Sequence, residues 1–218
     1  MGSKPITNKE LYERETPDGD IYGRIMKRDI NRFKDTSKHI HPQAMSLLDV
    51  GCCCGEWLNY ICEHYKLNHH LGIDIAENRV NEAKRMYPEL NVKVSSAEKL
   101  DFSEKSFDVV TCLEVLEHIP DWSSIFNSLF HFASKQVLIT VPYCEKITYS
   151  VCIHCGKSTP LWGHLRSYSE DSFPKLPGWS LSFAKIAEKN PESTLARRVY
   201  RLFKPYYPWL LIDYRYVG

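Results

Sequence analysis

Two carboxylates and an imidazole stand close together in the stretch "CLEVLEHIPD", as Glu114, Glu117 and His118. If the backbone makes a helical turn here, spacings of three and four residues place all three side chains on one face. Carboxylate oxygens and imidazole nitrogens are ligands of hard and borderline divalent ions. A fourth ligand of the same kind is His164, further along the chain in "LWGHLRSYSEDSF". We therefore predict a site for Mg²⁺ or Zn²⁺ made by these four residues.

The same residues also allow a reading without an ion. His118 can act as a general base toward an acceptor, or it can simply pack, and Glu114 can shape the pocket. In the catalytic reading, His118 and Glu114 are the residues that we expect to face the reacting group.

A second metal-like pattern is "CIHCG", in which Cys152 and Cys155 have the spacing of a zinc knuckle. A second such pair is missing, so closing the site would require Cys144, His154 or His164. Because His164 cannot serve both sites, the two metal hypotheses compete for it. The other reading is ordinary reduced thiols, which suits a chain of this size without a secretory leader.

The segment "DVGCCCGEW" places Gly51 and Gly55 between an apolar run and an amphipathic segment. Glycines there permit a tight turn and let backbone N–H groups approach a ligand closely. Asp74 ends the next apolar run, where a carboxylate can accept hydrogen bonds from ribose hydroxyls. The dinucleotide fingerprint fails, because Cys53 and Glu56 stand where it requires glycine. The pattern favours an adenosine-type cofactor without a pyrophosphate.

Three consecutive cysteines, 52–54, lie within this turn. Successive side chains on a turn diverge, so we do not expect them to chelate one ion together. The backbone of the loop is predicted to be its functional part.

Five apolar runs of strand length, 45–50, 70–75, 91–96, 107–113 and 136–143, alternate with amphipathic segments. This alternation is typical of a doubly wound α/β sheet with helices on both faces. We predict one domain in four parts: a cap at 1–44 with a helical pattern at 21–33, a cofactor-binding core at 45–143, a Cys/His-containing insert at 144–178 and a hairpin at 179–218. Within the hairpin, 179–188 and 209–217 alternate as strands around a basic helical segment at 193–203. In the insert, Trp162, Arg166 and Tyr168, with Tyr143 just before it, can line an acceptor pocket or pack as ordinary loop residues.

Four motifs occur in a characteristic order: "LLDVGCCCGEWL", "GIDIAENRV", "SSAEKLDFSEKSFDVVTCLEVLEHIPD" and "VLITVP". Together they resemble the class I S-adenosylmethionine-dependent methyltransferases, of the methyltransferase type 11 group. The E-x-x-E-H pattern with a later lone histidine is similar to ubiquinone-pathway O-methyltransferases and small-RNA terminal-ribose methyltransferases. The resemblance implies a Rossmann-like, three-layer α/β/α fold whose seven-stranded sheet has its last strand antiparallel. It also implies S-adenosylmethionine as cofactor, S-adenosylhomocysteine as product, and a metal beside a substrate with neighbouring hydroxyls.

The resemblance further implies which residues bind the cofactor. They are Asp49, Gly51, Cys53 and Gly55 at the methionine end, Asp74 and Ile75 at the ribose, Ser96, Ala97 and Glu98 around the adenine, and Leu113 with Glu114 facing the methyl group. Two positions depart from the family pattern: Cys53 replaces a glycine, and Ser96 replaces an acid.

The charge of the chain is balanced, with 28 Lys and Arg against 27 Asp and Glu. A phosphate-binding track is therefore not evident, and a nucleic-acid substrate is not favoured. No apolar run is long enough to span a membrane and no leader is evident, so a cytoplasmic location is expected. We expect methyl transfer to a hydroxyl of a small molecule or glycan. The alternatives are N-methylation of a small amine and a non-catalytic cofactor-binding module.

Overall fold

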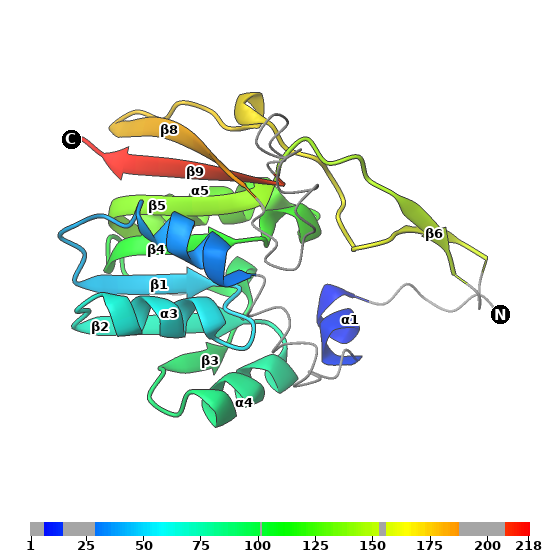
Figure 1. The fold of residues 1–218 in the computed structure, drawn as a ribbon, viewed down its shortest axis with the longest axis horizontal. Helices are drawn as coiled ribbons and strands as arrows, with labels where there is room; N and C mark the ends of the chain where they lie inside the picture. Colours follow the sequence, from blue (N-terminus) through cyan, green and yellow to red (C-terminus); the bar gives the residue numbers. More distant parts are fainter. Residues whose placement is uncertain (1–6, 15–28, 101, 153–155, 188–207) are drawn as a thin grey trace, which may run out of the picture.

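Seven strands form the central sheet of the computed structural model, which describes residues 7–14, 29–100, 102–152, 156–187 and 208–218. They are β1 (Ser46–Val50), β2 (His69–Asp74), β3 (Val92–Val94), β4 (Phe107–Leu113), β5 (Ala133–Pro142), β8 (Trp179–Ile186) and β9 (Trp209–Tyr216). Their order across the sheet is β3-β2-β1-β4-β5-β9-β8 (Figure 1). The first five are parallel, whereas β9 runs antiparallel to both β5 and β8. The predicted seven-stranded sheet with an antiparallel last strand is confirmed.

Helices cover both faces of this sheet. They are α3 (Glu56–His64), α4 (Glu77–Met86) and α5 (Trp122–Phe132), together with a helical segment at 29–37. The short α1 (Asn8–Arg14) lies instead beyond the carboxyl ends of the strands, against α4 (Figure 1). Because strand side chains alternate between faces, Leu47 packs with α3, α4 and the segment 29–37, whereas Leu48 packs with α5. The result is the three-layer α/β/α arrangement expected from the sequence.

The strand ends set the location of the site. β1 lies between β2 and β4, so the crossover connections diverge at β1 and leave a crevice at the carboxyl ends of these strands. Asp74 is the last residue of β2, and Glu114 directly follows the last residue of β4. Residues from separate motifs are thereby brought to one edge.

Beyond β5, the chain forms a small hairpin of β6 (Tyr149–Val151) and β7 (Ser158–Pro160), which is separate from the main sheet. Figure 1 shows this hairpin extending away from the body of the fold. The chain then returns, and Tyr168 pairs with Tyr143 at the end of β5. Cys155 and His154, from the predicted zinc knuckle, lie outside the described residues, as do the basic segment 193–203 and much of the helical pattern at 21–33.

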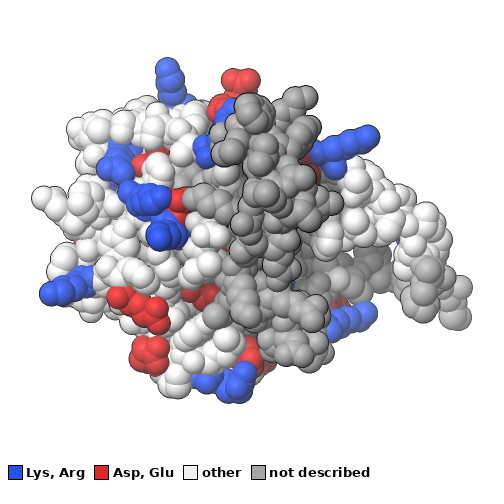
Figure 2. All heavy atoms as spheres, in the orientation of Figure 1, with Lys and Arg blue, Asp and Glu red and all other residues white. Residues whose placement is uncertain are grey.

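In the described part of the chain, no helix is both long and apolar enough to cross a membrane. Figure 2 shows basic and acidic side chains interspersed over the described part of one face, in keeping with the balanced composition.

Candidate functional site

The loop between β1 and α3 is a tight turn held by the end of β2. The amides of Gly51 and Cys52 both donate to the carbonyl of Ile73, at 2.8 and 2.9 Å. Gly51 and Gly55 have positive φ angles of 79° and 86°, and a Cβ on Gly51 would lie 2.4 Å from Val115. These two glycines are therefore required by conformation, and the first also by space.

Cys53, which replaces the family's glycine, also adopts a left-handed conformation, with φ of 49°. Its amide donates to Asp74 Oδ2 at 2.9 Å, and the amide of Ala76 donates to Asp74 Oδ1 at 2.9 Å. The Asp74 carboxylate thus fixes the β1–α3 loop and also lies at the edge of the crevice. A glycine would adopt the conformation of residue 53 without strain, whereas the cysteine adopts it at a cost.

The sulfur atoms of the cysteine triplet occupy different surroundings. Cys52 and Cys54 are buried, and Cys53 is half-buried. Cys53 Sγ and Cys54 Sγ nevertheless lie 4.0 Å apart, so the divergence predicted for the triplet does not hold for this pair. Burial raises the pKa of the Cys52 thiol well above its usual range. The hydrogen bond with Cys53, and then burial, raise the pKa of the Cys54 thiol. Neither thiol is activated as a nucleophile.

Asp49 lies at the end of β1 beneath this loop and is almost completely buried. It accepts a hydrogen bond from Thr111 Oγ1 at 2.7 Å. Burial raises the pKa of Asp49 to about 7, with the Thr111 hydrogen bond opposing the shift and the nearby Asp74 adding to it. A cationic group beside this carboxyl, such as the amine of a methionine moiety, would lower its pKa and stabilise its charged form.

On the far side of the crevice, Ser96 begins a short 3₁₀ turn at Ala97–Lys99. Its hydroxyl accepts from the amide of Glu98 at 3.2 Å, which is a helix-capping contact. Ser96, which replaces the family's acid, therefore stabilises the turn that forms this wall.

A cavity of about 1480 Å³ opens along this edge of the sheet. All of the predicted cofactor residues except Gly55 line it: Asp49, Gly51, Cys53, Asp74, Ile75, Ser96, Ala97, Glu98 and Leu113. Glu114, His118 and His164 line the same cavity. The sequence-predicted cofactor and catalytic residues thus share one crevice.

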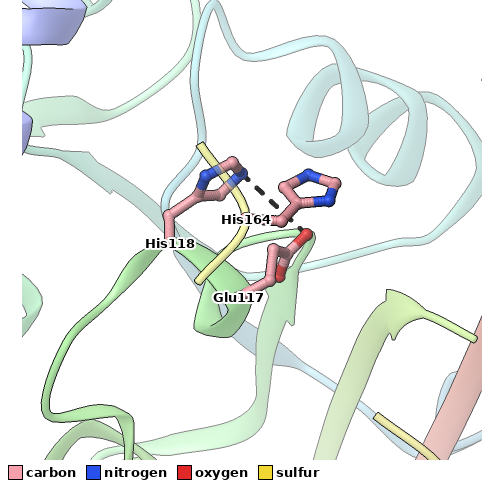
Figure 3. A group of neighbouring side chains, drawn as sticks. All are labelled: Glu117, His118 and His164. Atoms are coloured by element: carbon pink, nitrogen blue, oxygen red, sulfur yellow. Dashed lines mark ion pairs between the residues drawn. The ribbon is translucent and has the colours of Figure 1, made fainter. Parts of the chain in front are cut away.

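Three of the four predicted metal ligands come together. Glu117, His118 and His164 each offer one ligand atom, and these atoms all lie within 4.8 Å of one another (Figure 3). Glu117 is completely buried, and neither of its carboxylate oxygens has a hydrogen-bond partner. His118 Nε2 lies 4.0 Å from Glu117 Oε1. Burial, together with the nearby Glu114, raises the pKa of Glu117 well above its usual range. This arrangement can hold a divalent ion, because a cation could take the place of the proton that otherwise neutralises the buried carboxylate.

Glu114 is oriented differently from the other three. Its φ of 57° and its backbone hydrogen bond to Thr140 keep it beside β5, and the 3₁₀ turn begins only at Leu116. The helical face expected from the spacing does not form. Glu114 Oε1 instead lies 3.7 Å from Arg32 Nη1, and burial raises the pKa of Glu114 although Arg32 opposes the shift.

Burial lowers the pKa of His118 to about 4, with a further contribution from His164, whose ring centroid is 4.9 Å away. His118 is therefore a neutral imidazole near pH 7. A neutral imidazole can accept a proton or ligate a cation.

Comparison with known proteins identifies the domain. Residues 48–136 match the family model of the methyltransferase domain. A ubiquinone biosynthesis O-methyltransferase of Colwellia psychrerythraea is 36% identical over 123 residues, covering 47% of this chain and 49% of the relative. The (S)-tetrahydroprotoberberine N-methyltransferase of Eschscholzia californica is 24% identical over 170 residues, covering 68% of this chain and 49% of the relative. The chain thus spans about half the length of these curated relatives.

Solved structures share the complete fold. The complex between the Haloferax volcanii Trm112 methyltransferase activator and a methyltransferase matches with a TM-score of 0.69 at 15% identity, covering 95% of this chain and 98% of that chain. Magnesium protoporphyrin IX methyltransferase from Synechocystis, with bound S-adenosylmethionine, has a TM-score of 0.62 at 15% identity, covering 99% of this chain and 100% of that chain. Residues 48–136 thus form a methyltransferase domain, and the chain has the fold of the class I S-adenosylmethionine-dependent methyltransferases.

Several residues that line or adjoin the cavity were not found from the sequence. Arg32 contacts Glu114 and lies over the ring of Trp209 at 5.3 Å, and Tyr12 stacks beneath the Arg79 guanidinium at 4.4 Å. Glu145 pairs with His164 at 2.5 Å. Only Glu145 had a usable signal, because it follows the end of a parallel strand, where ligand-facing residues gather.

The predicted polar-aromatic wall is only partly formed. Tyr143 and Trp162 line the cavity. Tyr168 is buried in the hydrophobic core, and Arg166 donates to backbone carbonyls of Leu116, Ile119 and Pro120. Those two residues hold the site together without lining the cavity.

Proposed function

We propose that this chain transfers the methyl group of S-adenosylmethionine to a hydroxyl oxygen of a small molecule or glycan, assisted by a divalent ion. The observation that carries the proposal is the Glu117 carboxylate. It is fully buried, both oxygens lack hydrogen-bond partners, and His118 and His164 stand beside it at the cavity. A cation at this point would satisfy a group that the fold otherwise buries at a cost.

The donor set suits a borderline ion. Two imidazoles and one carboxylate favour Zn²⁺ and similar ions, whereas Mg²⁺ prefers a shell of oxygens. When bound, such an ion supplies a Lewis acid that lowers the pKa of an acceptor hydroxyl. Glu114, which Arg32 engages, is proposed to face the acceptor, since it lines the cavity beside Leu113.

The other residues that line the cavity are proposed to bind the cofactor. Bound S-adenosylmethionine supplies an electrophilic methyl group. We assign its ribose to Asp74, its methionine end to Asp49, Cys53 and the backbone of the β1–α3 loop, and its adenine to the turn that Ser96 caps. Neutral His118 can act as a ligand of the ion or, without an ion, as the base that takes the proton of the acceptor hydroxyl.

Three measurements test the proposal: cofactor binding, metal content and the effect of EDTA on activity. Isothermal titration with S-adenosylmethionine should show binding, and absence of heat at high cofactor concentration would overturn the assignment. Chain purified without chelator should contain a divalent ion, and EDTA should abolish methylation of catechol or sugar hydroxyls. His118→Ala and His164→Ala should lose the ion, whereas His131→Ala, an exposed histidine, should retain it.

A second candidate is N-methylation of a small amine. It is supported by the similarity to the N-methyltransferase of Eschscholzia californica and by the carboxylates of Glu114 and Glu145 on the cavity wall. In this case amines would be methylated and EDTA would have no effect. Binding of the cofactor without turnover of either acceptor class would indicate a non-catalytic module.

A further inference from the structure

The contact between Glu145 and His164 lies at the mouth of the proposed ion site. Glu145 Oε2 is 2.5 Å from His164 Nδ1, and the side chains are only 25% and 17% exposed, respectively. Both residues line the cavity. This is a partly buried pair inside the site rather than a surface ion pair, so its geometry is better fixed than that of exposed pairs.

The backbone just before Glu145 is held by the segment that contains Tyr168. Cys144, which precedes it, has a left-handed φ of 47°, and its amide donates to the carbonyl of Tyr168 at 2.8 Å. The neighbouring Tyr143 pairs with Tyr168 as a strand bridge. His164 is held in turn, because the amide of Leu165 donates to the carbonyl of Glu117 at 2.8 Å. Glu145 and His164 therefore meet through two anchored backbones.

We propose that Glu145 is the positioning residue for His164: its carboxylate accepts the Nδ1 proton and so leaves the Nε2 lone pair for the ion held with Glu117 and His118. A neutral imidazole carries one proton on its two ring nitrogens, so a fixed acceptor at Nδ1 selects one tautomer. A carboxylate in this place also increases the basicity of the ligating nitrogen.

The same contacts favour the site with Glu117 and His118 over the zinc knuckle as the one that His164 serves. His164 could have completed a zinc knuckle with Cys152, but its ring lies against His118 and its Nδ1 is taken by Glu145. The role of this tautomer in metal binding rests on the proposed metal-assisted function. The tautomer of His164 itself can be measured in metal-free protein. The two can be tested separately.

The first readout is the tautomer of His164 in metal-free protein, from ¹⁵N NMR of histidine-labelled chain, with His164→Asn used to assign the signal. In wild type and in Glu145→Gln, whose amide oxygen can still accept, the Nδ1–H form should dominate. In Glu145→Ala it should give way to the Nε2–H form that prevails in free histidine. An unchanged tautomer in Glu145→Ala would overturn the proposal.

The second readout is binding of Co²⁺ alone, followed by its visible absorption spectrum. Glu145→Ala should weaken Co²⁺ binding by about 10- to 100-fold, the usual effect of losing a partner behind a metal-bound histidine. Glu145→Gln should fall between Glu145→Ala and wild type. Glu89→Gln, an exposed glutamate in the turn before β3, should match wild type. Equal Co²⁺ affinity in Glu145→Ala and wild type would also overturn the proposal.

Titration with S-adenosylmethionine serves as the folding control, since all variants should bind it as wild type does. If wild type itself binds no Co²⁺, the metal-assisted part of the proposed function fails. The positioning of His164 is then decided by the tautomer alone.

Discussion

The backbone amide of Cys53 donates a hydrogen bond of 2.9 Å to the carboxylate of Asp74 and so links the β1–α3 loop to the last residue of β2. This contact explains how a cysteine occupies a position where the family has glycine. The left-handed conformation turns the Cys53 amide toward Asp74, and the hydrogen bond to a charged group offsets part of the strain.

Replacing Cys53 by glycine should therefore stabilise the chain. A non-glycine residue at positive φ costs about 1–2 kcal/mol, and glycine returns part of this through its more flexible unfolded state, so we expect a net gain of about 0.5–1 kcal/mol. Urea unfolding measures this gain, and cofactor titration should show affinity equal to or above wild type. Lys105→Gly is the matched control for the release of strain. Lys105 is exposed, has a similar φ of 54° and lies outside the β1–α3 loop. Cys53→Gly with lower stability than wild type would contradict the argument.

Asp74→Asn should weaken S-adenosylmethionine binding. The variant loses a charged acceptor for the ribose, and its amide group would oppose either the Cys53 or the Ala76 amide. Hydrogen bonds to charged groups contribute about 1.5–3 kcal/mol, which corresponds to a loss of roughly 10- to 100-fold in affinity. Isothermal titration measures the loss, with Asp171→Asn as an exposed control outside the cavity. Equal affinities in the two variants would remove the ribose assignment.

Asp49 should make the cofactor-free chain less stable as the pH rises. Burial raises its pKa from 3.8 to about 7 in the folded chain, so the folded state holds the proton more tightly than the unfolded state does. The stabilisation is complete below about pH 4 and is lost as the pH rises through about 7, by an amount on the order of a few kcal/mol. Asp49→Asn, which cannot ionise, should remove this loss, so its stability relative to wild type should increase between pH 4 and pH 8.

Asp108→Asn provides the control for the same urea unfolding series. Burial acts to raise the pKa of Asp108, but hydrogen bonds from the Met45 amide and Lys135 outweigh it and lower that pKa. The stabilisation from Asp108 is therefore complete above about pH 4 and is lost only as the pH falls further, so the stability of Asp108→Asn relative to wild type should stay nearly constant between pH 4 and pH 8. The same pH trend in both variants would be incompatible with a buried, proton-holding Asp49.

The sequence predicted the sheet and the crevice because both follow from local patterns. Apolar runs specify the strands, and the carboxyl ends of parallel strands must meet at one edge, which places Asp74 near the β1–α3 loop. The orientation of Glu114 was not predictable in this way. Its amide is bonded to Thr140 of β5 and its φ is 57°, so the chain bends after the end of β4 where the spacing suggested helix. Arg32 and Glu145 likewise acquire their partners only through tertiary packing.

Arg166 should hold the two halves of the proposed ion site together. Its guanidinium donates to the carbonyls of Leu116 and Pro120, each at 2.9 Å, and to that of Ile119, which joins the segment carrying His164 to the turn carrying Glu117. Arg166→Lys offers one ammonium group for three acceptors in a planar array, so buried carbonyls would lose partners. We expect a loss of about 1–3 kcal/mol in urea unfolding and faster amide exchange at 116–119. Arg85→Lys, which changes an exposed arginine paired with Glu82, should change neither quantity, and normal exchange at 116–119 in Arg166→Lys would show that the guanidinium does not fix this turn.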